Sequence, residues 1–367
     1  MKLRYRITLG ILGVLAGSLA VLALLLGHES ACEPAPDLAA DAQTMKAYMH
    51  RCYGSPDVLT LEDVAKPEPG HNELLVRVHA ASVNPYDWHD MRGSPYFMRL
   101  GSGFGRPKDP RLGADFAGTV EAVGKDVSRF QSGDRVFGGA AGAFGQYVTI
   151  AEDRGVALLP AGVAFEQAAA MPIAAISALQ ALRDKGKLQA GQKVLINGAS
   201  GGVGTFAVQI AKSYGADVTG VCSTRNVEMV RSIGADHVID YKTEDYTEGD
   251  TRYDLIVDMV GNHSLFANRR VLNPGGTLVM VGGQGGDWLG PLMRPIGAVL
   301  LSPFVDETLV MLLARMDGGD LAELAGLMES GDVTSVIDKR YPLAELPEAI
   351  RYSETGRARG KIIVNVD

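Results

Sequence analysis

The chain has 367 residues, of which 46% are hydrophobic, so it is long enough for two domains with substantial cores and is not a disordered or fibrous protein. Its net charge is -8 and no basic run follows the N-terminus, which argues against nucleic-acid binding. The three cysteines, Cys32, Cys52 and Cys222, are too few for a disulfide framework and form no Cys-x-x-Cys pair, which excludes a cysteine-rich structural zinc site.

The first distinct segment, residues 7–27, contains no charged residue and follows three basic residues between positions 2 and 6. At about 1.5 Å per residue it reaches the roughly 30 Å of a bilayer core, so we expect a single membrane-spanning helix. Three alternatives stay open. They are a cleaved signal peptide, a lipoprotein site at Ser30-Ala31-Cys32, where Glu29 stands in place of an aliphatic residue, and a buried core helix.

Residues 28–41 contain two prolines and several acidic residues and are predicted to form a linker, with the folded part beginning near Met45. From there to about Thr149, short alternating segments such as residues 74–79 and 118–123 are separated by proline and glycine, which indicates a small antiparallel barrel. Residues 158–182 then take a helical pattern.

The glycine-rich stretch at residues 194–204 predicts a buried strand, a tight turn and a helix start. Gly198, Gly201 and Gly204 are spaced three apart, so two can lie where a Cβ would block a ligand while the third lets helix and strand pack closely. The free N–H groups of such a turn, together with the helix dipole, favour a phosphate. A glycine-rich turn without a ligand is the alternative.

Four further apolar segments repeat the strand spacing after this turn, at residues 217–221, 238–241, 255–260 and 277–281. Strand patterns that alternate with helical patterns predict a doubly wound parallel sheet.

The order of these features resembles the medium-chain dehydrogenase/reductase superfamily, from about Met45 to Asp367. The markers of the resemblance are residues 117–120 with 123–124, 133–136, 198–204, 234–236 with 240–241, and 360–364. The resemblance implies an α/β fold, in which a GroES-like β-barrel domain at residues 45–167 is completed by residues 313–367. A Rossmann NADP-binding domain at residues 168–312 follows, and residues 1–44 form the membrane anchor and linker.

Zinc-dependent alcohol dehydrogenases of this superfamily carry a cysteine and a histidine ligand where this chain has Asn84 and Ala114, which cannot ligate zinc in those roles. The resemblance narrows to the zinc-free quinone oxidoreductase and alkenal/enone reductase branch, whose signatures are met by residues 84–88 and 113–118. Without a Lewis acid, reduction of a quinone or an activated C=C is easier than alcohol oxidation. A non-catalytic NADPH-binding membrane protein and an alcohol dehydrogenase stay open as alternatives.

The cofactor is expected to be NADP(H). A site that prefers NAD places an acid after the second strand, whereas this chain has Ser223 and Arg225 there, which can pair with a 2′-phosphate. Relatives often have lysine where this chain has Asn226. The resemblance also implies that Tyr241 closes over the phosphate and that Ser177 lies near the nicotinamide. An ordinary solvated turn and an inert helix-surface serine are the alternatives.

The remaining cofactor-binding residues are expected at the carboxyl edge of the sheet, where ligands bind in such folds. They are Ser200, Gly201, Gly202, Val203, Asn262 and Gly282. Asn262 could instead cap a helix that starts near His263.

Three predicted catalytic residues, Asn84, Tyr86 and His89, lie in the segment that faces the nicotinamide in the resembled family, and Tyr96 follows closely. They are the natural donors to a substrate oxygen. His89 stands where several relatives have lysine and has a suitable reference pKa, although a packed, non-catalytic histidine is the alternative.

The expected partners are a small electrophilic carbonyl or quinone, the membrane through residues 7–27 and no nucleic acid, with a possible homodimer. The positive-inside rule places the reductase domain outside the cytoplasm. The demand for NADPH places it inside, and we favour a cytoplasm-facing domain.

Overall fold

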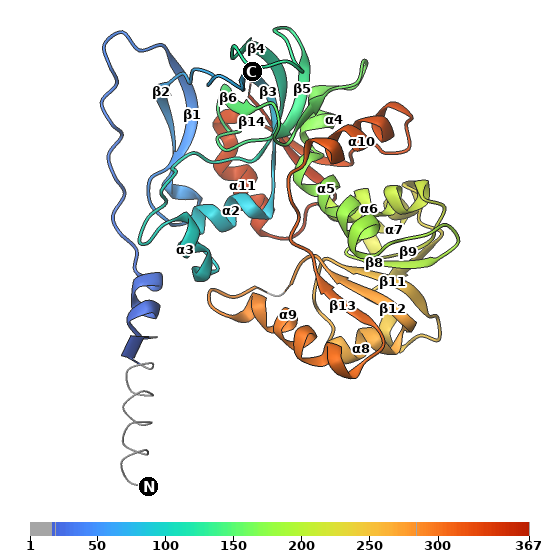
Figure 1. Cartoon of the computed structure of the whole chain (residues 1–367). Helices are drawn as coiled ribbons and strands as arrows, with labels where there is room; N and C mark the ends of the chain where they lie inside the picture. Colours follow the sequence, from blue (N-terminus) through green and yellow to red (C-terminus); the bar gives the residue numbers. More distant parts are fainter. Residues whose placement is uncertain (1–16, 19, 284, 367) are drawn as a thin grey trace, which may run out of the picture.

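The computed structural model describes residues 17–18, 20–283 and 285–366. Its strands form a two-stranded, a seven-stranded and a six-stranded sheet, which lie in two domains (Figure 1). The two-stranded and seven-stranded sheets lie together in one domain, and the six-stranded parallel sheet lies in the other. The predicted α/β architecture, with a GroES-like and a Rossmann-like domain, is confirmed.

The first domain is a barrel of mainly antiparallel strands. The strand pair is β1 (Thr44–His50) with β2 (Leu59–Ala65). The seven-stranded sheet has the order β14-β15-β3-β4-β5-β7, with β6 on β3. Its strands are β3 (Glu73–Val83), β4 (Asp115–Val123), β5 (Arg135–Gly139), β6 (Tyr147–Ala151), β7 (Val156–Leu158), β14 (Ile337–Pro342) and β15 (Lys361–Asn365). The C-terminal strands therefore return to the barrel, as expected from the resemblance.

The second domain is built on six parallel strands in the order β10-β9-β8-β11-β12-β13. Their bounds are β8 (Lys193–Asn197), β9 (Asp217–Cys222), β10 (His237–Asp240), β11 (Tyr253–Asp258), β12 (Leu272–Met280) and β13 (Thr308–Met311). The strand order reverses between β8 and β11, and ligands of such sheets bind at the carboxyl ends of the strands beside that reversal.

The α-helices connect the strands and join the two domains. They are α2 (Pro85–Arg92), α3 (Arg99–Ser102), α4 (Phe165–Ala169), α5 (Pro172–Gln180), α6 (Gly202–Ser213), α7 (Val227–Ser232), α8 (Leu265–Arg270), α9 (Gly290–Leu301), α10 (Gly318–Glu329) and α11 (Leu346–Glu354). Helix α5 is buried along nearly its whole length, because it lies where the barrel meets the parallel sheet (Figure 1).

The predicted membrane anchor at residues 7–27, and with it the predicted membrane localisation, is wrong. Within the part of the chain that the structure describes, no helix is long and apolar enough to cross a bilayer. Residues 7–16 and 19 of the predicted anchor lie outside the described residues.

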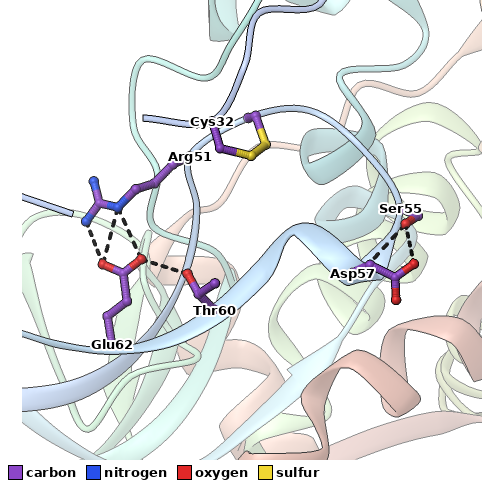
Figure 2. The surroundings of a disulfide bond; sticks show 7 residues. Cys32, Arg51, Ser55, Asp57, Thr60 and Glu62 are labelled. Carbon is purple, nitrogen blue, oxygen red and sulfur yellow. Dashed lines mark hydrogen bonds and ion pairs between the residues drawn. A yellow bond between two sulfur atoms is a disulfide. The ribbon is translucent and has the colours of Figure 1, made fainter. Parts of the chain in front are cut away.

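The predicted linker begins with residues that are attached to the barrel domain. Cys32 forms a disulfide with Cys52, directly after β1 (Figure 2). Glu29 pairs with Gly105 in an isolated β-bridge. Cys222 is free, so the cysteines form a single cross-link and no disulfide framework. The sequence reasoning did not predict this cross-link.

Candidate active site

The glycine-rich turn joins β8 to α6 at the strand-order reversal. Gly198 adopts φ +93°, a conformation that favours glycine. A Cβ on Gly204 would lie 2.1 Å from the carbonyl oxygen of Gly198, so this glycine allows the helix to pack against the turn. The N-terminus of α6, at Gly202 and Val203, thus follows the turn as in dinucleotide-binding folds.

The C-terminal strand of the barrel begins against this turn. The Gly360 amide donates to the carbonyl oxygen of Ser200 at 3.0 Å, and Gly201 and Gly360 form a parallel bridge. A Cβ on Gly202 would lie 3.2 Å from the side chain of Lys361. The barrel and the predicted cofactor loop are therefore in direct contact.

Beyond the end of β9, the structure brings together the residues predicted to bind a 2′-phosphate. Arg225 is exposed, and its guanidinium donates to the carbonyl oxygen of Arg357 at 2.5 Å. The Tyr241 amide donates to the carbonyl oxygen of Cys222 at 3.0 Å, so the half-exposed Tyr241 lies beside the start of the Ser223 turn. Both side chains are accessible to solvent, although the Arg225 guanidinium already holds one carbonyl oxygen of the protein.

Asn226 is a residue of this region that the sequence reasoning did not assign to the site. It is buried, and its amide nitrogen donates to the hydroxyl oxygens of Ser200 at 2.9 Å and Ser223 at 3.2 Å. It therefore connects the glycine-rich turn to the end of β9. Its amide oxygen is buried without a hydrogen-bond partner. The sequence signal was its position, one residue after Arg225 at the end of the second strand of the parallel sheet.

A polar cluster occupies the carboxyl ends of β8 and β11. The Asn197 amide nitrogen donates to the side-chain oxygens of Asp258 and Asn262, each at 2.9 Å. The Gly282 amide donates to the Asp258 carbonyl oxygen at 3.2 Å, so the four residues lie together at one edge of the sheet. The alternative role for Asn262 is wrong, because the N-cap of α8 is Ser264.

Arg294 joins this cluster from α9. Its guanidinium donates to the buried carboxylate of Asp258 at 2.8 Å, and its Nε and Nη1 atoms are buried without partners. Sequence reasoning did not assign Arg294 to the site, because nothing in the sequence relates it to Asp258.

Ser177 lies on α5 and is buried. Its hydroxyl donates to the carbonyl oxygen of Ile173 within the same helix, at 2.7 Å. Such a bond satisfies the hydroxyl proton locally. A role near the nicotinamide stays a prediction.

Asn84 is the N-terminal cap of α2, and its side chain is buried in a charged network. Its amide nitrogen donates to Asp115 at 2.9 Å, while its amide oxygen accepts a hydrogen bond from Lys361. Both ends of the amide are thus occupied within the protein. The arrangement suits a residue that positions the network rather than one that donates to a substrate.

The network contains three buried ionisable groups, Asp87, Asp115 and Lys361. Burial raises the pKa of Asp87 to about 8, and one of its carboxylate oxygens has no partner. Burial also raises the pKa of Asp115 and lowers that of Lys361. The network was missed because Lys361 opens the apolar run of a strand, where its charge has no visible partner in sequence.

Tyr86 and His89 lie three positions apart on α2 and therefore share one face of the helix. The phenol of Tyr86 is half exposed, and partial burial, followed by the charges of Asp90 and Asp87, raises its pKa. The phenol consequently keeps its proton at neutral pH. Of the three predicted catalytic residues, Tyr86 has the most exposed side chain.

His89 is partly buried, with its ring centroid 3.8 Å from that of Trp88. Burial lowers the pKa of its imidazole. Its Nδ1 atom lies 2.6 Å from the carbonyl oxygen of Ser94, so Nδ1 carries a proton and Nε2 of the neutral ring is an acceptor. Donation of a proton from Nε2 would require the imidazolium form.

Comparisons with known proteins match this geometry. Residues 70–161 match the family model described as "Alcohol dehydrogenase GroES-like domain", and residues 233–364 match "Zinc-binding dehydrogenase". The quinone oxidoreductase of Sus scrofa is 34% identical, covering 85% of this chain and 94% of that protein. The 2-methylene-furan-3-one reductase of Solanum lycopersicum is 32% identical, covering 88% and 79% respectively.

The solved structure of the quinone oxidoreductase from Coxiella burnetii superposes with a TM-score of 0.78 at 30% identity. It covers 89% of this chain and 100% of that one. Among the residues described here, no three His, Cys, Asp or Glu side chains are grouped so that they could hold a metal ion.

Proposed function

Because the chain belongs to the medium-chain dehydrogenase/reductase superfamily and is an oxidoreductase with quinone oxidoreductases among its relatives, we propose that it transfers hydride from NADPH to quinones or α,β-unsaturated carbonyls without zinc. The family binds NAD(P)H. Membership of the family does not by itself specify NADPH over NADH, the substrate class or independence of zinc, and these are the parts that we propose.

The observation that carries the proposal is the set of residues that follows the end of β9. The segment that carries Ser223 and Arg225 contains no acidic residue of its own, and Asn226 connects Ser223 to the glycine-rich turn. The nearby carboxylate of Asp240, at the end of β10, is hydrogen-bonded to Thr224. The Arg225 guanidinium is exposed and can form charge-assisted hydrogen bonds to a phosphate. The half-exposed Tyr241 lies beside the start of this turn and can cover the ligand.

The bound nicotinamide would supply the hydride, so the protein needs only to orient the substrate and stabilise the oxygen that gains negative charge. The Tyr86 phenol, which keeps its proton at neutral pH, suits that role. The network of Asn84, Asp115 and Lys361 holds the start of α2, and therefore Tyr86, against the turn that binds the cofactor.

Independence of zinc is supported by the donor set. Asn84 and Ala114 offer neither a thiolate nor an imidazole, and the Asn84 amide is bonded at both ends within the protein. Reduction of a conjugated carbonyl does not require deprotonation of an alcohol, which is the step for which a Lewis acid is most needed.

The test is NADPH oxidation by the full-length protein with a p-benzoquinone, an alkyl vinyl ketone and a saturated aldehyde as separate acceptors. We expect turnover with the quinone or the enone, preference for NADPH over NADH, and unchanged rates in a metal chelator. Equal use of NADH, or activity that a chelator removes and zinc restores, would overturn the corresponding part of the proposal.

A further inference from the structure

Arg99 is the most deeply buried arginine of the described chain and uses all five of its N–H groups. It lies at the start of α3, in the segment between α2 and β4. Two of these groups bind within the same segment. Nε donates to the Gly93 carbonyl oxygen at 2.7 Å, and Nη2 donates to the Arg92 carbonyl oxygen at 3.2 Å. A buried guanidinium is tolerated only when its donors and its charge are satisfied.

The other three donors of Arg99 bind residues 26–33, which we name the N-terminal strap. Nη1 donates to the carbonyl oxygens of Leu26 at 2.9 Å and His28 at 3.0 Å, and Nη2 donates to the Glu29 carboxylate at 3.0 Å. Three of these five hydrogen bonds therefore come from the strap, and so does the carboxylate that pairs with the arginine.

The strap is attached to the same segment of the barrel domain at further points. The Ser30 amide donates to the Gly105 carbonyl oxygen at 2.9 Å, and Glu33 pairs with Arg106. The disulfide from Cys32 to Cys52 adds a covalent attachment (Figure 2).

The disulfide lies next to a residue that packs directly on Arg99. Cys52 precedes Tyr53, whose ring centroid is 4.5 Å from the Arg99 guanidinium and whose hydroxyl donates to the Gly103 carbonyl oxygen at 2.9 Å. The disulfide and Arg99 therefore both hold the segment of residues 92–108, the disulfide through Tyr53 and Arg99 directly.

On its other face, Arg99 packs against Tyr96, again at 4.5 Å from the ring centroid. Tyr96 contacts the Rossmann domain, because its ring meets Trp288 edge-on at 4.9 Å and its amide donates to the Asp287 carbonyl oxygen at 2.6 Å. Ser94, which accepts the hydrogen bond from His89, also donates to the Asp287 carboxylate at 2.6 Å. One chain of contacts thus runs from the strap to α2 and across to the second domain.

We propose that the N-terminal strap is a structural part of the substrate site, in which Arg99 is the positioning residue and the Cys32–Cys52 disulfide fixes the strap in place. The strap holds residues 92–108 so that Tyr96 meets Trp288 beside the predicted donors on α2. Without the disulfide, the strap is held by hydrogen bonds and ion pairs alone and samples more conformations. This inference rests on the proposed reductase function.

The test uses Cys32→Ser in the full chain. Cys32 is exposed, so its replacement removes the cross-link without emptying a core. We expect the KM for the quinone or enone to rise about tenfold, because small displacements of positioning groups are costly, while the Kd for NADPH is unchanged. Cys52→Ser should behave alike. The unfolded wild type should titrate with one free thiol, that of Cys222.

Arg99→Lys should raise the same KM further, because lysine has three donors and no planar group to pack between the two tyrosines. Arg135→Lys is the matched control. Arg135 also packs on an aromatic ring and bonds a carbonyl oxygen, at Phe165 and Val163, without contact to the strap. If Arg99→Lys does not fold, the substrate KM and the hydrogen exchange of Cys32→Ser test the proposal instead.

A lower melting temperature of Cys32→Ser with an unchanged substrate KM would overturn the proposal, since the strap would then only stabilise the fold. Amide hydrogen exchange of residues 92–108, measured without cofactor or substrate, separates this proposal from the reductase assignment. We expect faster exchange in Cys32→Ser than in the wild type. Equal exchange overturns the strap proposal even if the enzyme is active, whereas faster exchange in a protein that reduces no quinone or enone contradicts only the proposed reaction.

Discussion

The ammonium group of Lys361 lies 3.7 Å from the carboxylate of Asp115, and both side chains are buried where the barrel meets the glycine-rich turn. Asn84 bridges them, because its amide accepts from the lysine and donates to the aspartate. Asp115 also accepts from the Ile173 amide at the start of α5, at 3.1 Å. A single buried charge pair thus ties α2, α5 and the C-terminal strand together.

Replacing Lys361 with methionine should destabilise the protein, because it leaves the buried Asp115 carboxylate without its cation. We expect the free energy of unfolding to fall by about 3 kcal/mol, measured as a shift of the urea midpoint. The double variant Lys361→Met/Asp115→Asn should recover part of that loss. The exposed Lys125 provides the control Lys125→Met. A Lys361→Met protein as stable as this control would show that the Lys361–Asp115 pair does not contribute to the free energy of unfolding.

The stability of the protein should depend on pH through Asp87. Burial raises the pKa of Asp87 from 3.8 to about 8. Between these values the folded state keeps a proton that the unfolded state has released, so stability falls as pH rises, by at most about 1.4 kcal/mol per pH unit. Asp87→Asn keeps the shape without the charge. Its stability relative to the wild type should therefore increase between about pH 5 and pH 8. A difference that does not vary with pH would contradict this account.

Replacing Arg225 with glutamine should weaken NADPH binding by about 1 to 3 kcal/mol and leave NADH nearly unchanged, since only NADPH carries the 2′-phosphate. Titration calorimetry with each cofactor measures both values. Arg231→Gln is the control, because Arg231 is an exposed arginine of α7 that pairs with Glu228. A parallel loss for the two cofactors would remove Arg225 from the phosphate site.

Replacing Tyr86 with phenylalanine should lower kcat about tenfold to a few hundredfold while NADPH binding stays intact, because the phenol supplies one donor to the developing negative charge. His89→Gln should lower kcat within the same range if His89 also takes part. Stopped-flow measurement of NADPH oxidation separates the chemical step from product release. Wild-type rates in both variants, with a verified substrate, would exclude both side chains from the reaction.

Local patterns predicted the two domains well. Residues 217–221, 238–241 and 255–260 fall on β9, β10 and β11 to within two residues at each boundary, since buried parallel strands are continuous apolar runs. The spacing of Gly198 and Gly204 predicted the turn, since its backbone conformation and close packing require glycine. These features depend on neighbours in sequence.

The features that sequence reasoning missed depend on distant partners. Lys361 and Asp115, Arg294 and Asp258, and Arg99 and the strap are each far apart in the chain, so no spacing relates them. The apolar composition of residues 7–27 predicted a membrane helix, yet Leu26 is buried against the protein and its carbonyl oxygen binds Arg99. The homodimer stays a prediction.

Transfer of deuterium tests the central claim most directly. The full-length protein is given NADPH that carries deuterium at the transferable position of the nicotinamide, with an alkyl vinyl ketone in excess, and the product is analysed by mass spectrometry and NMR. The account predicts the saturated ketone with one deuterium on the carbon β to the carbonyl, formed faster than with the equivalent NADH. A saturated product without deuterium at that carbon, or no reduction of any enone or quinone, would contradict it.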